Sequence, residues 1–251
     1  TLGGADDVVV DDLSGTDMTG ITVDLRGTDG GGDEAADAVT IRGTNSADVF
    51  GAAGDVGGII VFGLQAAVEM YFTEPGLDQL TLEALAGDDV VDATSLEAGA
   101  IQLTITGGLG DDVMLGSEDN DLIVGGDGND LALMNAGDDT FVWSPGDDDD
   151  ILEGQGGFDE MIFNGANVAE QIDIFANGGR VFFTRDVANV VMDLDDVERI
   201  SFLARGGADT ILVDDLSGTD AVAIEVELAE ETAIAAPDTI FVQGTAGDDV
   251  I

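Results

Sequence analysis

The chain has 251 residues, and its charge excludes more functions than any other feature: 54 acidic residues stand against 6 basic ones, a formal net charge of −48. All the basic residues are arginine, and lysine, histidine and cysteine do not occur. Nothing in such a chain could neutralise phosphates, which excludes nucleic acid as a partner. A disulfide scaffold is also excluded, and the usual nucleophilic and zinc-protease mechanisms lack their residues. We therefore expect a protein that is not an enzyme.

The kind of acidic residue narrows the explanation of the charge. Halophilic adaptation would favour acids of either kind, yet 14 of the 54 acids are Glu, which leaves 54 − 14 = 40 Asp. Short Asp side chains in turns are what cation ligation requires. We therefore favour cation-binding sites over halophilic adaptation as the explanation of the acidic composition.

Residues 1–106 carry short apolar, often β-branched runs about every ten residues, with Gly, Asp and Ser between them. No sustained helical period with caps interrupts them. The pattern predicts strand after strand, as wider coils of a β-solenoid. We expect turn aspartates at similar positions of these coils to form a ladder, since their separations of 41, 41 and 23 fit whole coils: Asp7, Asp48, Asp89 and Asp112.

The longest apolar run extends from Val56 to Phe72 and is interrupted by Gln65 and Glu69. A membrane-spanning helix needs about 20 apolar residues. We therefore expect no membrane insertion here, and two buried strands joined by a turn instead. The first residues enter a Gly/Asp turn at once, so a Sec-type signal is not expected at this end.

Residues 107–163 contain a nine-residue frame that repeats six times, with Trp143 and Ser144 as an insert. Each frame opens with turn-forming residues and closes with a short apolar run whose middle residue should point into a narrow core between two sheets. In frame order the segments are GGLGDDVML, GSEDNDLIV, GGDGNDLAL, MNAGDDTFV, PGDDDDILE and GQGGFDEMI.

The sixth position of every frame is aspartate. If one frame is half a coil, aspartates two frames apart stack on the same edge, in the pairs 112/130, 130/150, 121/139 and 139/159. Carboxylates at the strand spacing of about 4.8 Å repel each other. A hard dication between them relieves the repulsion. The predicted ligands are Asp112, Asp121, Asp130, Asp139, Asp150 and Asp159.

These frames follow the G-G-x-G-x-D-x-U-x pattern, and the stretch resembles the RTX, or haemolysin-type calcium-binding, repeat family. Frames 107–115 and 125–133 match at every defined position, whereas Ser117 and Asp119 replace glycines in the frame between them, and two later frames lack the opening glycine pair. The resemblance implies an all-β, right-handed parallel β-roll with Ca²⁺ held by the six aspartates and by turn carbonyls. The glycines it names are Gly108, Gly110, Gly126, Gly128 and Gly137.

Residues 164–205 are expected to continue as β coils with a hairpin. Two apolar runs, at 172–175 and 181–183, flank the turn sequence Ala-Asn-Gly-Gly, which is a hairpin signal. An aromatic core stack is expected here, made of Phe163, Phe175, Phe182, Phe183 and Phe202.

Residues 206–251 repeat the start of the chain. The segment at 3–17 reads GGADDVVVDDLSGTD and the segment at 206–220 reads GGADTILVDDLSGTD, an offset of 206 − 3 = 203. Similarity continues from 39–44 to 240–245. We interpret residues 206–251 as the start of the next unit of a tandem array, because solenoid units stack end to end.

The sequence therefore predicts a calcium-dependent structural repeat of a secreted or cell-surface array, such as a fibre, a matrix layer or an adhesin stalk. Its partners would be calcium ions and neighbouring repeats or copies. The resemblance also implies type I secretion, with the chain unfolded in calcium-poor cytosol. Two alternatives stay open: the calcium-folded module of a larger secreted enzyme, and a carbohydrate- or ice-binding surface.

Overall fold

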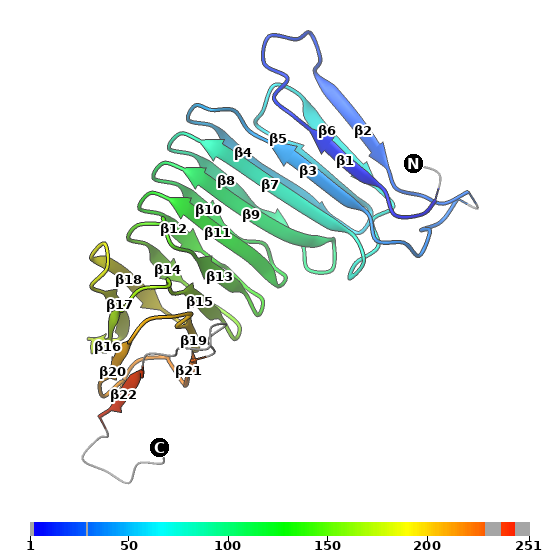
Figure 1. Cartoon of the computed structure of the whole chain (residues 1–251). Coiled ribbons are helices and arrows are strands. Elements are labelled where there is room, and N and C mark those ends of the chain that lie inside the picture. The colour runs from blue at the N-terminus through cyan, green and yellow to red at the C-terminus, as the bar shows by residue number, and fades with distance from the viewer. Residues whose placement is uncertain (1–2, 29, 229–236, 244–251) are drawn as a thin grey trace.

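The structure is a computed structural model that describes residues 3–28, 30–228 and 237–243. Within these residues it is all-β, with 22 strands in two long sheets and no helix. β1 and β22 lie at opposite ends of the stack (Figure 1). The described part of the chain contains no helix long and apolar enough to cross a membrane.

Every strand pair of the nine-stranded sheet is parallel. Its spatial order is β1 (Asp7–Val10), β3 (Ala38–Arg42), β7 (Gln79–Ala86), β9 (Gln102–Leu109), β11 (Asp121–Asp127), β13 (Thr140–Trp143), β15 (Glu160–Asn164), β19 (Arg199–Leu203) and β21 (Ala223–Glu227).

The thirteen-stranded sheet is parallel except in two places, where a three-stranded antiparallel meander is inserted. Its order is β2 (Gly20–Asp24), β6 (Ala67–Tyr71), β5 (Gly58–Phe62), β4 (Val49–Asp55), β8 (Val90–Leu96), β10 (Val113–Leu115), β12 (Leu131–Leu133), β14 (Ile151–Glu153), β18 (Val190–Asp195), β17 (Arg180–Arg185), β16 (Gln171–Asn177), β20 (Thr210–Val213) and β22 (Thr239–Val242).

From β7 to β15 each successive strand lies in the other sheet. We call one strand of each sheet, with the turns that join them, a layer. Among the nonapeptides, the register of neighbouring layers is 18 residues, as in Val113 paired with Leu131, and 20 residues across the Trp143–Ser144 insert, as in Leu131 paired with Ile151. One nonapeptide therefore makes half a layer, as the frame predicted, and the arrangement is compatible with a β-roll.

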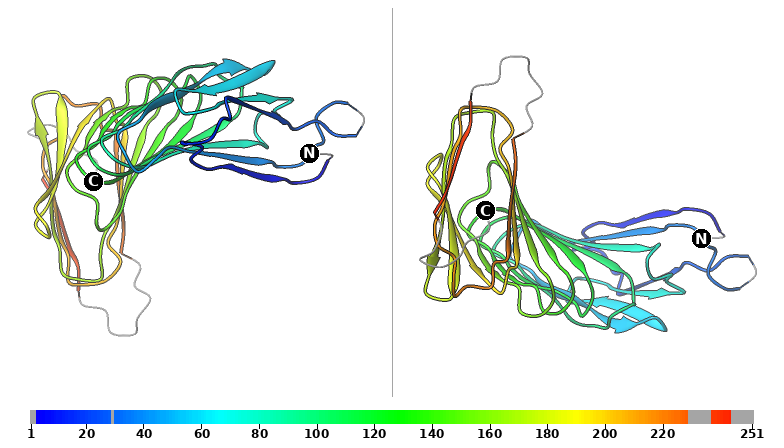
Figure 2. Two further views of the ribbon diagram at one scale, coloured as in Figure 1. Left: turned by 90° about the horizontal axis from the view of Figure 1, so that it is seen from above. Right: turned by 90° about the horizontal axis from the view of Figure 1, so that it is seen from below.

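The core lies between the two sheets and follows the period of two expected for strands with one buried face. The middle residues of the first four apolar runs, Met114, Ile123, Ala132 and Phe141, are all buried. The sheets twist along the stack, so the strands of the last layers run in a clearly different direction from those of the first (Figure 2).

The predicted hairpin is confirmed, because β16 and β17 pair antiparallel with Phe175 opposite Phe182. The two strands expected within 56–72 are also present, as the antiparallel pair β5 and β6. The sequence did not reveal that each pair belongs to a three-stranded meander, completed by β18 in one case and by β4 in the other. The two sheets run through the boundaries expected at 106/107 and 163/164, since β9 and β15 cross them.

The aromatic stack is present in part. Phe163 stacks on Trp143 with ring centroids 3.9 Å apart, and Phe183 and Phe202 are buried against it. The prediction was wrong for Phe175 and Phe182, which are only half-buried and pack edge to face with each other at 5.8 Å. They occupy alternate positions of β16 and β17, so their side chains lie on the face away from the core.

Candidate metal centre in the turns

The aspartates that end each nonapeptide turn lie directly above one another. The backbone N–H of Asp112 donates to Oδ1 of Asp130 at 2.8 Å, and that of Asp130 donates to Oδ1 of Asp150 at 2.9 Å. On the other edge, Asp121 donates to Asp139 at 2.7 Å and Asp139 to Asp159 at 2.9 Å. The structure thus brings together all four pairs that the spacing predicted.

These bonds form because each aspartate immediately precedes or begins a strand. Its N–H stands at the end of the parallel ladder, and a buried N–H without a partner is costly. The carboxylate of the next layer accepts that hydrogen bond, and an ionised acceptor makes it strong. One oxygen of each accepting carboxylate is therefore used to hold adjacent layers in register.

The ladder extends beyond the nonapeptides. Asp48 donates to Oδ1 of Asp89 at 2.6 Å, and Asp89 donates to Oδ1 of Asp112 at 2.8 Å. The prediction was wrong for Asp7, which begins β1 in the other sheet. Its neighbour Asp6 instead starts a second ladder, donating to Asp37 at 2.8 Å, and Asp37 donates to Oδ1 of Asp78 at 3.0 Å.

The second carboxylate oxygen divides the ladder residues from Asp48 to Asp159 into two groups. In Asp48, Asp78 and Asp121 this oxygen accepts the backbone N–H of the residue four positions earlier, at 2.5 to 2.7 Å. Asp121 receives the hydroxyl of Ser117 on its other oxygen as well, at 2.7 Å. The carboxylates of this first group are satisfied by the protein itself.

In the second group the oxygen Oδ2 is buried and has no hydrogen-bond partner within the described residues. Each of these side chains is 2% exposed or less. A buried charged oxygen without a partner is strongly destabilising. The group consists of Asp89, Asp112, Asp130, Asp139, Asp150 and Asp159.

Backbone conformation separates the two groups. Four residues before each member of the second group the chain has a positive φ, at Leu85, Gly108, Gly126, Asn135, Gly146 and Gln155. None of the corresponding residues of the first group, Thr44, Glu74 and Ser117, is among the positive-φ residues. A positive φ turns the peptide group over. The N–H that would otherwise satisfy Oδ2 is then directed elsewhere.

The same turns bring carbonyl oxygens together. A Cβ at Gly126 would lie 2.2 Å from the carbonyl oxygen of Gly108, and one at Gly128 would lie 2.1 Å from that of Gly110. A Cβ at Gly107 would lie 2.3 Å from Oδ2 of Asp112 and 2.5 Å from the carbonyl oxygen of Gly125. A side chain at any of these glycines would therefore collide with a backbone carbonyl or a carboxylate oxygen.

The electrostatics of the second group are unfavourable without a cation. Burial, and then the neighbouring carboxylates, raise the pKa of Asp112 and Asp159 to about 6, of Asp130 to about 7, and of Asp139 and Asp150 to about 8. Burial raises the pKa of Asp121 to about 6 against the hydrogen bonds from Ser117. The turns therefore hold carboxyl groups that ionise less readily than exposed aspartates do.

An all-oxygen ligand set suits a hard cation such as Ca²⁺ and does not suit a soft one. The five glycines that the resemblance named, Gly108, Gly110, Gly126, Gly128 and Gly137, all have positive φ, as turns that face a cation require. Asp121 differs from the other predicted ligands because its own turn already satisfies both oxygens.

Sequence reasoning did not assign Asp89 to a site, although its turn has the same geometry as the nonapeptide turns. The Gly-Asp-Asp at 87–89 followed by Val90 and Val91 carried the signal. It was obscured because Leu85, with φ 79°, occupies a position where a glycine would be expected.

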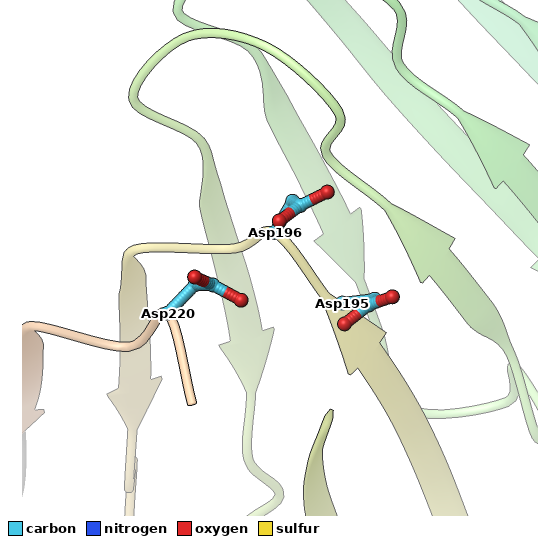
Figure 3. Close-up of side chains that lie close together, drawn as sticks. All are labelled: Asp195, Asp196 and Asp220. Carbon is cyan, nitrogen blue, oxygen red and sulfur yellow. The ribbon is translucent and has the colours of Figure 1, made fainter. Parts of the chain in front are cut away.

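A separate acidic cluster lies where β18 ends. One carboxylate oxygen from each of Asp195, Asp196 and Asp220 lies within 4.8 Å of the others (Figure 3). Asp195 is ion-paired with Arg180 at 3.1 Å, and all three side chains are at least partly exposed. Exposed acids near an arginine are satisfied by solvent, so this cluster does not resemble the turn sites.

Comparison with known proteins gives no relative: no protein-family model matches the sequence, and no curated protein matches it.

Gly126→Ala should destabilise the fold and weaken cation binding, because the new Cβ meets the carbonyl of Gly108 and fills the space between layers. Gly99→Ala is the matched control, since Gly99 also has a positive φ of 73° but nothing lies within 4 Å of its Cβ. The control should lose about 1–2 kcal/mol from backbone strain alone. Urea unfolding in saturating calcium measures both; equal losses would contradict the packing argument.

The metal-free chain should become more stable as the pH falls. A carboxyl whose folded pKa is raised contributes stability that is fully present below its unfolded pKa of about 3.8 and is lost as pH rises through the folded value, here about 6 to 8. In chelator, the β signal in circular dichroism should therefore be stronger at about pH 5.5 than at about pH 8. A β signal that strengthens as the pH rises would contradict the assignment.

Proposed function

We propose that this chain is a calcium-dependent structural repeat, and that it folds as a right-handed parallel β-roll of the RTX type. The observation that supports the proposal most directly is the group of six buried Oδ2 atoms without partners, stacked in adjacent layers. Bound Ca²⁺ would supply the missing partners and offset the repulsion between the carboxylates.

The ligands we propose are the carboxylates of Asp112, Asp130, Asp139, Asp150 and Asp159, with the turn carbonyls beside them. Asp89 joins this set on the same geometric grounds. We propose a smaller contribution from Asp121, because Ser117 already donates to both of its oxygens. The glycines contribute carbonyl oxygens and, by lacking a side chain, the room for the ion.

Calcium would also decide whether the chain folds. At a formal charge of −48 the metal-free chain repels itself. Each site at about 100 times its dissociation constant would contribute about 2.7 kcal/mol, against a net stability of about 5–15 kcal/mol for an ordinary domain. A few such sites are enough to shift the balance between the unfolded and folded chain.

This dependence supports an extracellular location, where calcium is abundant, and export of an unfolded chain from calcium-poor cytosol. The repeat of residues 3–17 at 206–220 supports membership of a tandem array. We propose a structural role in a fibre, a matrix layer or an adhesin stalk, with neighbouring repeats as partners and no catalytic role for this chain.

Circular dichroism in chelator and in millimolar calcium tests the proposal. The chain should be largely disordered in chelator at low salt and neutral pH, because the stacked carboxylates then have no counter-charge. Calcium should produce a β spectrum, and magnesium at equal concentration should not, since Mg²⁺ dehydrates reluctantly and demands octahedral geometry. A β spectrum that is unchanged in chelator would refute the proposal.

Asp130→Asn should lower the calcium affinity more than Asp121→Asn. The amide introduced by Asp130→Asn would retain an oxygen for the N–H of Asp112 but would lose the charge and the unpartnered oxygen. We expect a loss of about tenfold or more for Asp130→Asn. Isothermal titration calorimetry measures affinity and stoichiometry. Equal losses in the two variants would show that the unpartnered oxygen does not mark the ligand.

A further inference from the structure

The first and the last layers of the stack are two copies of the same structure. β1, β2 and β3 correspond to β20, β21 and β22, at an offset of 203 residues for the first two, as in 210 − 7 and 223 − 20. The turn after the first strand is also shared: Ser14 N–H donates to Asp12 at 2.7 Å, and Ser217 N–H donates to Asp215 at 2.9 Å.

Pairing inside the two copies is the same. Val8 pairs with Val39 in parallel register, and its counterpart Ile211 pairs with Ile240. The ladder bond is repeated as well, since Asp6 donates to Asp37 at 2.8 Å and Asp209 donates to Asp238 at 2.9 Å. The structure of this segment is therefore independent of the end of the stack at which it lies.

The two copies differ in what lies on their N-terminal side. At the C-terminal end, β16 pairs with β20 and β19 pairs with β21, both parallel. Glu170 donates its N–H to Oδ1 of Asp209 at 2.8 Å, and Thr210 donates to the carbonyl of Glu170 at 2.9 Å. In the first layer the same edge of β1 and β2 has no strand beside it among the described residues.

The uncovered edge shows two corresponding deficits. Val8 and Val10 are only partly buried, whereas Ile211 and Val213 are buried at 0% and 7% exposure. A Cβ on Gly207 would lie 2.3 Å from the carbonyl of Val168, whereas nothing lies within 4 Å of the corresponding position on Gly4.

We propose that the open edge of β1 and β2 is a docking surface for β16 and β19 of a preceding unit of the same sequence, in the register that β20 and β21 show. Asp173 of the preceding unit then lies beside Val9, because Asp173 pairs with Leu212. Ile200 lies beside Ile21, because Ile200 pairs with Ile224. An exposed strand edge can pair with a strand of another chain. This sequence itself contains the matching strands, β16 and β19.

The docking also specifies how the sheets continue. β1 belongs to the nine-stranded sheet, whereas β20 belongs to the thirteen-stranded sheet. Each sheet of one unit therefore continues as the other sheet of the next, and the two-sheet stack crosses the junction without a gap. This inference rests on the array part of the proposed function and does not depend on which residues bind calcium.

The test is a tandem chain in which residues 1–205 are followed by residues 3–251, studied in calcium where circular dichroism shows β structure. The sequence has no cysteine, so Asp173→Cys in the first unit and Val9→Cys in the second introduce a single pair. Neighbouring strands lie about 4.8 Å apart, within the reach of a disulfide. Oxidation should give an intramolecular disulfide.

The matched control places cysteine at Val8 instead of Val9, on the opposite face of the strand, and should give no disulfide. The absence of a disulfide in the Val9 chain, equal disulfide formation in both chains, or bonds only between molecules would overturn the proposal. Calorimetry on the 251-residue chain measures calcium binding separately, so a failed junction and a failed calcium assignment give different results.

Discussion

The fold depends on a hydrogen bond between layers, in which the N–H at the start of one strand is accepted by the carboxylate at the start of the strand stacked on it. This bond fixes the register of the sheets, and it forces carboxylates to stack at the strand spacing. Asp48, Asp89, Asp112, Asp130 and Asp150 form one continuous column of this kind. The interaction that aligns the layers therefore also creates the repulsion that a cation would relieve.

Local turn geometry decides how each carboxylate in a column is satisfied. Where the residue four positions earlier has a negative φ, its N–H satisfies the second oxygen, as Ser117 does for Asp121. Where that residue has a positive φ, as at Gly126, the second oxygen stays without a protein partner. The backbone conformation at this one position, which is glycine in three of the six cases, thereby distinguishes a purely structural aspartate from a candidate ligand.

Much of this could be predicted from the sequence, because two strict periods are involved. The period of two within each apolar run places Met114 and Phe141 inside, and the period of nine places Asp112 beside Asp130. The meanders and the position of Asp7 could not be predicted, because neither follows from periodicity: a strand that reverses has the same alternation as one that continues. The orientation of Phe175 depends on which alternate residues of β16 face the core. The unsatisfied oxygen of Asp89 depends on the positive φ of Leu85, which the sequence does not indicate because this residue is not a glycine.

The distribution of arginine shows where the chain supplies its own cations. All six arginines lie at 26, 42, 180, 185, 199 and 205, so residues 43–179 contain no basic side chain. Beyond that segment, a buried ladder acid is matched by the protein: Glu170 forms an ion pair with Arg185, which is also buried, and accepts the N–H of Ala166. Arg180 likewise lies among Glu153, Asp193 and Asp195 where β14, β17 and β18 meet. Within the nonapeptide layers the same ladder position carries a buried aspartate, and none of these aspartates forms an ion pair with an arginine of the described chain. A compensating charge would therefore have to come from solution, which is the physical basis of the calcium dependence proposed above.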